Sequence, residues 1–333
     1  MTAVLEQPPA QQSNCALGKV FPEFFLIGMK NTGTSSLSQD LRHRGVFAAP
    51  DDMHKEWQFF MTRPTHGHPT EMTMFKEWIE ALPDCPEDGE RKIVADFSVT
   101  TSFAEALPND FVWSPKYGYP AKSTGDVSCW GSAAYISHFY GNASMPAPKF
   151  MVLLRDPLER LQSEWYHTRK KLNCLGCDLA NNFSASLAGN IELMKKTPPE
   201  MSDWLWKNYY SRQVESFLEQ FDSSHFAFIP DKEYIAGKDP VAFSRSLLSW
   251  LDIKAEPWSQ ATHRNEHSAR PPLDEELPPS SQVRKDYEAL MAPELDRLAK
   301  TLADAQLKGA WLTMYDGPKG DVAQIRDWLV NHW

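Results

Sequence analysis

A short segment near the N-terminus has the residue types and the spacing of a phosphate-binding loop. Gly28, Gly33, Thr34 and Ser35 follow the pattern G-x-x-x-x-G-T-S, in which Thr34 stands where such a loop has its lysine. Main-chain N–H groups at the start of a helix bind an anion together with the helix dipole, so the loop can still hold a phosphate. Hydroxyl groups that add donors belong to Thr32, Thr34, Ser35 and Ser36. The alternative is an ordinary strand-to-helix turn with a hydroxyl cap.

A second anion site is predicted further along the chain. Arg155 ends an apolar stretch, and Ser163 follows eight residues later on the second turn of a predicted helix. An arginine guanidinium suits bidentate binding of a phosphate, and a hydroxyl adds one more hydrogen bond. Two phosphate sites on one chain favour a nucleotide that carries phosphate groups at both ends.

The elements that must position these residues are predicted from four apolar segments. The segments are residues 24–27, 93–97, 149–154 and 224–230, and helical patterns follow the first, third and fourth. Continuous apolar runs indicate strands that are buried on both faces, and alternation of strands with helices indicates a parallel sheet with right-handed crossovers. We therefore expect an α/β fold in a single domain, with a central parallel sheet flanked by helices.

Composition and charge narrow the class of protein. The 333 residues include 12 Trp, 18 Phe and 10 Tyr, which excludes disorder for the bulk of the chain. A formal net charge of −10 opposes nucleic acid as the main partner. The N-terminus has no signal-peptide pattern and no apolar run approaches about 18 residues, so we expect a soluble, cytoplasmic protein without a membrane span. Residues 1–19 are predicted to be disordered and residues 20–333 to form the domain.

The cysteines give no sign of a disulfide framework or a metal site. Five cysteines form an odd set, which argues against such a framework. Cys174 and Cys177 have C-x-x-C spacing, but no second Cys or His pair completes a zinc site. We therefore expect two free thiols in a loop there, and no bound metal.

Three motifs resemble those of the sulfotransferases that depend on 3′-phosphoadenosine 5′-phosphosulfate (PAPS). Residues 25–37 are similar to the family's F-L-I-I-G-x-x-K-x-G-T-T-x-L, and residues 154–166 to its L-R-x-P-x-x-R-x-x-S-x-Y. Residues 55–60, KEWQFF, resemble the K-E-I-x-F-F segment of the heparan sulfate type, whose Glu is the catalytic base. The resemblance covers roughly residues 22–305 and implies a sulfotransferase fold of the P-loop NTPase-like kind.

The resemblance also implies an activity and a set of site residues. A sulfuryl group would pass from PAPS to a hydroxyl or amine of an acceptor by in-line displacement, with 3′-phosphoadenosine 5′-phosphate (PAP) as the product and without a metal. Glu56 would be the general base, and Lys30 would stabilise the bridging oxygen of the leaving group. The residues implied to bind the nucleotide are Lys30, Asn31, Thr32, Gly33, Thr34, Ser35, Ser36, Arg155, Ser163, Tyr210 and Arg270.

The chain departs from the family's pattern at several positions. Asn31 stands where the family has the lysine of its first loop, and Lys30 precedes it. Phe97 replaces a second active-site lysine, and only Arg270 remains of a C-terminal segment that contacts the nucleotide. His54 is a rival for the role of the base. These departures leave the identity of the catalytic cation open.

Two other functions stay open at this point. A P-loop nucleotide or small-molecule kinase would need an Asp that holds magnesium, for which Asp96 is a weak candidate. A non-catalytic nucleotide-binding protein would fit the two missing lysines. For a sulfotransferase, the acidic balance favours a small metabolite over a polyanionic glycosaminoglycan as acceptor, and residues 111–119 with Trp130 offer walls for its pocket. The acceptor's identity and the oligomeric state are not determined.

Overall fold

The computed structural model describes residues 13–48, 56, 60, 71–87, 90–99, 101, 112–113, 131–169, 182–262 and 270–333. Its centre is a six-stranded sheet with the strand order β10-β9-β7-β3-β5-β4, and all neighbouring strands run parallel. The predicted α/β fold with a central parallel sheet is confirmed. The strands of the sheet are β3 (Phe24–Gly28), β4 (Val46–Phe47), β5 (Ile93–Asp96), β7 (Lys149–Leu154), β9 (Phe226–Pro230) and β10 (Trp311–Leu312).

The three middle strands are buried because their sequences are continuous apolar runs. Every residue of β3 and of β9 is buried, and in β7 only Lys149 is partly exposed. The chain leaves the carboxyl ends of these strands into α1 (Thr34–Arg42), α4 (Pro157–Arg169) and α8 (Asp231–Ala236). Because neighbouring parallel strands end at the same edge of a sheet, three strand-to-helix turns meet there.

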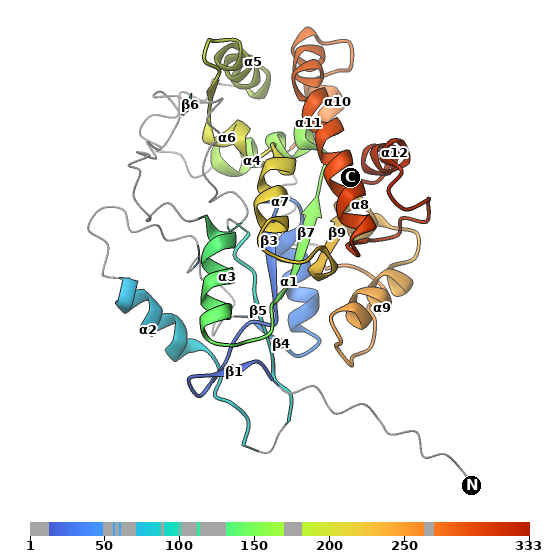
Figure 1. Cartoon of the computed structure of the whole chain (residues 1–333). Coiled ribbons are helices and arrows are strands. Elements are labelled where there is room, and N and C mark those ends of the chain that lie inside the picture. Colours follow the sequence, from blue (N-terminus) through green and yellow to red (C-terminus); the bar gives the residue numbers. More distant parts are fainter. Residues whose placement is uncertain are drawn as a thin grey trace.

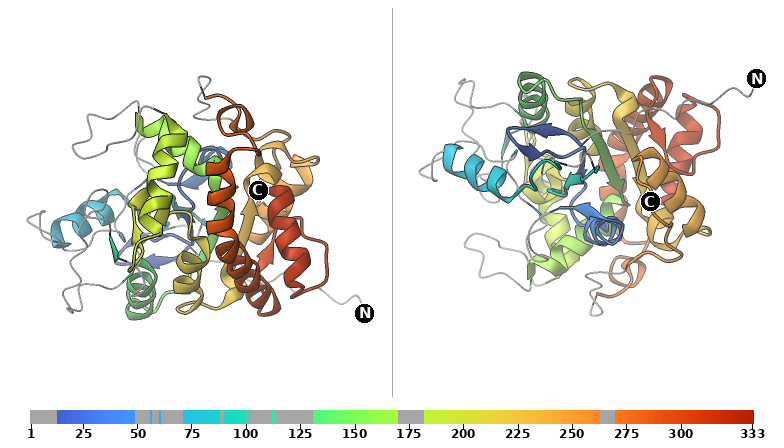
Figure 2. Two further views of the ribbon diagram at one scale, coloured as in Figure 1. Left: turned by 90° about the horizontal axis from the view of Figure 1, so that it is seen from above. Right: turned by 90° about the horizontal axis from the view of Figure 1, so that it is seen from below.

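Helices cover both faces of the sheet (Figure 1, Figure 2). On one face, Phe25 and Phe150 pack in a core with α3, α7, α11 and α12. On the other face, Leu26 and Met151 pack in a core with α1, α8 and α9. Successive side chains of β3 and β7 thus point into opposite cores, as the pleat of a strand requires. The bounds of these helices are α3 (Ser132–Asn142), α7 (Tyr210–Leu218), α9 (Pro240–Trp250), α11 (Gln282–Leu307) and α12 (Val322–His332).

A third core lies beyond the sheet, where α4 packs against later helices. Leu161 and Trp165 of α4 contribute to it together with Leu187 and Trp206. Figure 1 shows α4, α5 and α6 gathered at the end of the molecule away from β1. This core fixes the face of α4 that carries the candidate site residues. The helices that join α4 and α11 in it are α5 (Phe183–Met194), α6 (Asp203–Trp206) and α10 (Leu273–Glu276).

The first described residues correct the predicted N-terminal boundary of the domain. The sequence predicts disorder through residue 19, but β1 (Cys15–Ala16) and β2 (Lys19–Val20) form an antiparallel hairpin. Val20 and Phe21 are fully buried in the first core and hold the hairpin against it. The prediction missed this because the residues before them are mostly polar. The prediction for residues 1–12 lies outside the described residues.

A disulfide joins Cys15 to Cys85, and the inference that the odd set of cysteines argues against a disulfide framework is wrong for this pair. The two residues are 70 positions apart, and a bridge between Lys19 and Asp84 brings their segments together. Sequence spacing contains no sign of this long-range contact. Disulfides are typical of oxidising compartments, so the pair gives no support to the predicted cytoplasmic location. Cys174 and Cys177 lie outside the described residues.

The other described elements are short or lie near the periphery. They are α2 (Glu71–Ala81), β6 (Val112–Trp113), β8 (Glu200–Met201) and the 3-10 helix η4 (Ser223–His225). Of residues 107–131, the structure describes 112–113, which form β6 and pair with β8, and residue 131. Residues 273–276, in a Pro-rich part of the sequence, form α10. Among the described residues, no helix combines the length and the apolar character needed to cross a bilayer.

Candidate functional site

The predicted phosphate-binding loop forms a tight turn between β3 and α1. Asn31 and Gly33 adopt left-handed backbone angles, with φ of 66° and 82°. A Cβ atom on Gly33 would lie 3.1 Å from Ile235 Cδ1, so glycine there suits both the φ angle and the close approach of α8. Thr32 is fully buried, and its hydroxyl donates to the Met29 carbonyl oxygen at 2.6 Å. The hydroxyl of Thr32 therefore holds the turn together.

The start of α1 points main-chain N–H groups at this loop. The first N–H groups of a helix have no partner within it and carry the positive end of the dipole; the Ser36 N–H already closes back on the Gly33 carbonyl oxygen at 2.9 Å. Asn31, Gly33 and Ser35 are partly exposed, whereas Thr34 and Ser36 are buried. The Asn31 side-chain amide nitrogen is buried and has no hydrogen-bond partner among the described residues. This edge of the loop can therefore donate to an anion.

Arg155 lies at the end of β7, beside the loop. Its Nη1 donates to the Asn31 carbonyl oxygen at 3.4 Å, and its Nη2 donates to a Glu159 carboxylate oxygen at 3.0 Å. Its Nε lies 3.4 Å from Asp231 Oδ2, at the start of α8. Only 14% of the Arg155 side chain is exposed. The guanidinium thus joins all three strand-to-helix turns, and the structure brings the two predicted phosphate motifs together. We call Arg155, Glu159 and Asp231 the Arg155 cluster.

Asp231 is the member of the Arg155 cluster whose protonation responds to pH near neutrality. Burial raises the pKa of Asp231 to about 7, although the positive charge of Arg155 opposes the rise. The Glu159 carboxylate adds to the rise, because two acidic groups share one guanidinium. Asp231 Oδ1 is buried without a hydrogen-bond partner among the described residues. The single guanidinium therefore does not fully neutralise the two carboxylates of the cluster, and Asp231 exchanges a proton near pH 7.

Lys30 reaches from the loop toward α4. Its Nζ lies 3.8 Å from Glu164 Oε1, and 34% of the side chain is exposed. Glu164 also forms ion pairs with Arg160 and Lys207, each at 2.7 Å. Burial alone would raise the pKa of Glu164, but these three cations outweigh it and lower the pKa to about 2. We call Lys30, Arg160, Glu164 and Lys207 the Glu164 cluster.

Arg160 belongs to a buried network rather than to an open anion site. The side chain is fully buried, donates from Nε to Asn208 Oδ1, and donates from Nη2 to the Trp204 carbonyl oxygen at 2.9 Å. Asn208 in turn donates to the Pro157 carbonyl oxygen at 2.9 Å and to the Tyr287 hydroxyl at 2.5 Å. Arg160 therefore ties α4 to the segment after α6 and, through Asn208, to α11.

Two predicted nucleotide-binding residues have different surroundings in the structure. The Tyr210 ring is buried, and its hydroxyl donates to the Arg155 carbonyl oxygen at 3.1 Å, so Tyr210 supports the turn that carries Arg155. Burial raises the pKa of Tyr210 far above its ordinary value, which keeps the hydroxyl a donor. Ser163 is partly exposed on α4, directly before Glu164.

Arg270 and Glu56 were predicted from segments that the structure describes only in part. Arg270 lies near the Arg155 cluster, since burial first and then repulsion from Arg155 lower its pKa. Glu56 is partly exposed, and its neighbours on both sides, His54 among them, lie outside the described residues. Its role as general base stays a prediction.

Sequence reasoning missed three charged residues of this site. Asp231 follows an apolar strand just as Arg155 does, so a search of every strand end would have found it. Glu164 is adjacent to Ser163, but nothing in its local pattern distinguishes it from a solvated helix residue. Lys207 lies 43 positions from Glu164 and has no motif of its own. Only the packing of α6 against α4 reveals it.

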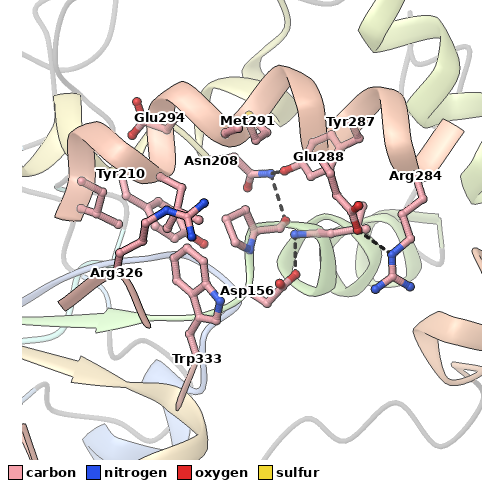
Figure 3. A pocket seen from close by; sticks show the side chains of 15 residues that line it. Asp156, Asn208, Tyr210, Arg284, Tyr287, Glu288, Met291, Glu294, Arg326 and Trp333 are labelled. Carbon is pink, nitrogen blue, oxygen red and sulfur yellow. Dashed lines mark hydrogen bonds and ion pairs between the residues drawn. The ribbon is translucent and has the colours of Figure 1, made fainter. Parts of the chain in front are cut away.

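A cavity of about 340 Å³ lies beside the turn between β7 and α4 (Figure 3). Tyr210, Met291 and Trp333 contribute to its largely apolar wall. Asp156, also at the wall, accepts from the Leu158 N–H at 2.8 Å and thereby caps α4. Burial raises the pKa of Asp156. The cavity shares Tyr210 with the turn that holds Arg155, and its described lining includes none of residues 29–36.

Comparison with known proteins gives limited information. No protein-family model matches the chain, and no curated protein sequence matches it. Among solved structures, it is similar to the crystal structure of a sulfotransferase from Alicyclobacillus acidocaldarius, with a TM-score of 0.49 and 19% sequence identity. The aligned part covers 84% of this chain and 94% of that chain. A similarity at this level says nothing about the site, whose function has to be inferred from its own residues.

Proposed function

We propose that this protein is a sulfotransferase that takes a sulfuryl group from PAPS and transfers it to a hydroxyl or amine of a small acceptor. The observation that carries the proposal is the contact between Arg155 Nη1 and the Asn31 carbonyl oxygen at 3.4 Å. Two anion motifs, separate in sequence, therefore meet at one edge of the sheet. Their order and spacing resemble those by which the family binds the two ends of its donor.

The chemistry of the described residues fits a nucleotide with two phosphate-bearing ends. The buried donor atom Asn31 Nδ2 has no hydrogen-bond partner among the described residues, and Arg155 Nε faces Asp231 Oδ2 at 3.4 Å without a hydrogen bond. Buried donors of this kind are costly unless a ligand or water satisfies them. The loop around Gly33 would hold the 5′ end of the donor. Arg155, Ser163 and Arg270 would hold the 3′-phosphate, and Tyr210 would keep Arg155 in place.

The loop and its lysine would supply the catalytic stabilisation. Sulfuryl transfer, like phosphoryl transfer, is expected to have a loose in-line transition state in which charge builds on the bridging oxygen, so positioned cations and N–H groups matter most. The Lys30 ammonium is the partly exposed cation that reaches out from the loop itself. Glu56 would take the acceptor's proton, a role commonly worth about 10² to 10⁴ in rate. Lys30 would thus act on the leaving group, and Glu56 would act on the attacking acceptor.

The acceptor is proposed to be a small metabolite, whereas the Cys15–Cys85 disulfide disfavours the cytoplasmic location that the sequence predicts. A net charge of −10 disfavours a long polyanionic acceptor. A ³⁵S-labelled donor incubated with a metabolite extract would identify the acceptor class. Labelling of glycosaminoglycan chains in preference to small compounds would overturn this part of the proposal.

Calorimetry with PAP in the absence of magnesium tests the donor. We expect micromolar or tighter binding, and weaker binding of adenosine 5′-monophosphate, which lacks the 3′-phosphate. No binding of PAP would refute the proposal. Tight binding of ATP with magnesium, together with phosphate transfer, would instead indicate a kinase.

Substitution of Glu56 and Lys30 tests the two catalytic assignments. Glu56→Gln should keep PAP affinity and lower turnover by about 10² or more. Glu80→Gln, at an exposed position of α2, serves as the matched control. Lys30→Ala should lower kcat more than it raises KM for PAPS, because Lys30 acts on charge that develops in the transition state. The exposed Lys238→Ala is its control. Unchanged turnover in either test variant would remove that residue from the mechanism.

A further inference from the structure

One buried carboxylate in the site binds more cations than it can neutralise. Glu164 receives Arg160 and Lys207 at 2.7 Å, and Lys30 at 3.8 Å. Side-chain exposure is 0% for Arg160, 6% for Lys207 and 34% for Lys30. The ion pairs of Glu164 with Arg160 and Lys207 are therefore inside the protein, and its longer ion pair with Lys30 lies nearer to the surface.

Two buried cations compensate the Glu164 carboxylate at short distance. Buried charges are tolerated when they are paired at good geometry, and Arg160 and Lys207 both pair at hydrogen-bond distance. Arg160 is itself fixed by Asn208 and the Trp204 carbonyl oxygen. The carboxylate thus has a fixed position on α4. Its ion pair with Lys30 is additional, longer and nearer to solvent.

We propose that Glu164 is a positioning residue for Lys30, which it holds over the phosphate-binding loop and yields to the incoming donor. This proposal rests on the proposed function, in which Lys30 stabilises the bridging oxygen. When an anionic donor enters, Lys30 exchanges a 3.8 Å contact for the donor, while Arg160 and Lys207 continue to compensate Glu164. The exchange leaves no buried charge unpaired.

Such a tether is useful because a lysine side chain is flexible. Fixing a free lysine costs up to about 2 kcal/mol of rotamer entropy, and a partner in the free protein removes part of that cost before the donor binds. The family's lysine position is occupied by Asn31 in this chain. A lysine one position earlier leaves the loop at another angle, and Glu164 supplies an anchor toward which it is directed.

Chemical labelling tests the tether without any need for turnover. Glu164→Gln alone would remove the carboxylate that pairs with both Arg160 and Lys207. The test variant is therefore Glu164→Gln with Lys207→Met, in which Arg160 keeps its bonds to Asn208 and the Trp204 carbonyl oxygen, and Lys207→Met alone is its matched control. A small amine-reactive ester, read by mass spectrometry, should modify Lys30 about three- to tenfold faster in the double variant than in the control. Exposed Lys238 should react equally in both. An unchanged Lys30 rate in the folded double variant would overturn the proposal.

A kinetic cycle in the Lys207→Met background separates positioning from mere support of the fold. If Glu164 acts through Lys30, Glu164→Gln should lower kcat severalfold when Lys30 is present and less than twofold when Lys30 is alanine. Equal effects in both backgrounds would overturn the proposal. If the unsubstituted protein does not transfer a sulfuryl group from PAPS, the proposed function fails, and the labelling experiment still decides whether Glu164 holds Lys30.

Discussion

The Arg155 cluster and the Glu164 cluster both contact the loop between β3 and α1 and have opposite charge balances. In the first, one guanidinium faces two carboxylates, and the pKa of Asp231 is raised to about 7. In the second, one carboxylate faces three cations, and the pKa of Glu164 is lowered to about 2. Both acids are buried. Burial therefore does not decide the charge of an acid by itself; the ratio of its partners does.

The difference assigns different tasks to the two clusters. Around neutral pH, Glu164 stays ionised and acts as a permanent anchor, while Asp231 gains or loses a proton. An anion that binds beside Arg155 must compete with Asp231 and Glu159 for the guanidinium. At the Glu164 cluster, the same anion faces three cations and only one carboxylate. We expect substitutions in the two clusters to have different effects on stability and on anion binding, of which the largest is described first.

The largest effect is expected for stability at the Glu164 cluster. Glu164→Gln leaves Arg160 and Lys207 buried without their counter-ion, and should lower the free energy of unfolding by about 3–5 kcal/mol. Glu159→Gln, on the same helix but at the more exposed end of the Arg155 cluster, should cost less than about 1 kcal/mol. Urea unfolding of both variants measures the comparison. Equal losses of unfolding free energy in the two variants would show that the two clusters do not differ in this way.

The next effect concerns anion binding at the Arg155 cluster. Arg155→Met should weaken PAP binding about 100-fold, since charge-assisted bonds to a phosphate contribute about 3 kcal/mol. Arg155→Lys keeps the charge but loses the planar fork, and should recover about tenfold of that loss. Calorimetry gives both dissociation constants. A Met variant that binds PAP as tightly as the unsubstituted protein would show that Arg155 does not contact the ligand.

A smaller effect for each unit of pH is expected in the pH dependence of stability. The folded pKa of Asp231, about 7, exceeds its ordinary value of 3.8, so its contribution is complete below pH 3.8 and is lost as pH rises through 7. Glu164 behaves in the opposite way, because its folded pKa of about 2 is below 4.5; its contribution is complete above pH 4.5 and is lost toward pH 2.

The variant Asp231→Asn tests how much Asp231 contributes to the change of stability with pH. Between pH 4 and 7 the variant should lose less stability than the unsubstituted protein, by roughly 1 kcal/mol per pH unit at most. Arg155, Glu159, Lys232 and Asp156 surround Asp231 and should remain unchanged in the variant. Glu294, whose pKa burial also raises to about 7, makes Glu294→Gln the necessary control. Parallel profiles for Asp231→Asn and the unsubstituted protein would show that Asp231 does not titrate there.

The smallest effect is expected at the outer end of the Arg155 cluster. Lys232 Nζ lies 3.7 Å from Glu159 Oε1, and 53% of the Lys232 side chain is exposed. Lys232→Met should change the free energy of unfolding by less than about 0.5 kcal/mol and the PAP dissociation constant less than twofold. Thermal unfolding and calorimetry measure the two values. A larger change in affinity would place Lys232 at the ligand.

Prediction from sequence succeeded where the signal was local. The runs 24–27 and 149–154 became β3 and β7, because a strand buried on both faces has to be apolar throughout. Of the run 224–230, only residues 226–230 form a strand, β9, and residues 224–225 belong to η4. The meeting of Arg155 with the loop followed from the same pattern, since parallel strands end at one edge. The Cys15–Cys85 disulfide was missed because it depends on a contact across 70 residues. The N-terminal hairpin pairs Cys15 with Val20 and Ala16 with Lys19, and it was missed because the polar residues before it favoured a prediction of disorder.

The sequence by itself determined the middle strands β3, β7 and β9, the turn that follows β3 and the position of Arg155 after β7, because each depends on neighbours within a few residues. Only the tertiary structure decided how the charged groups behave. Glu164 and Asp231 are both carboxylates on helices that follow strands, and nothing in their local sequence separates a pKa of about 2 from one of about 7. The number of cations around a buried carboxylate is set by distant segments, and Lys207 reaches Glu164 across 43 residues.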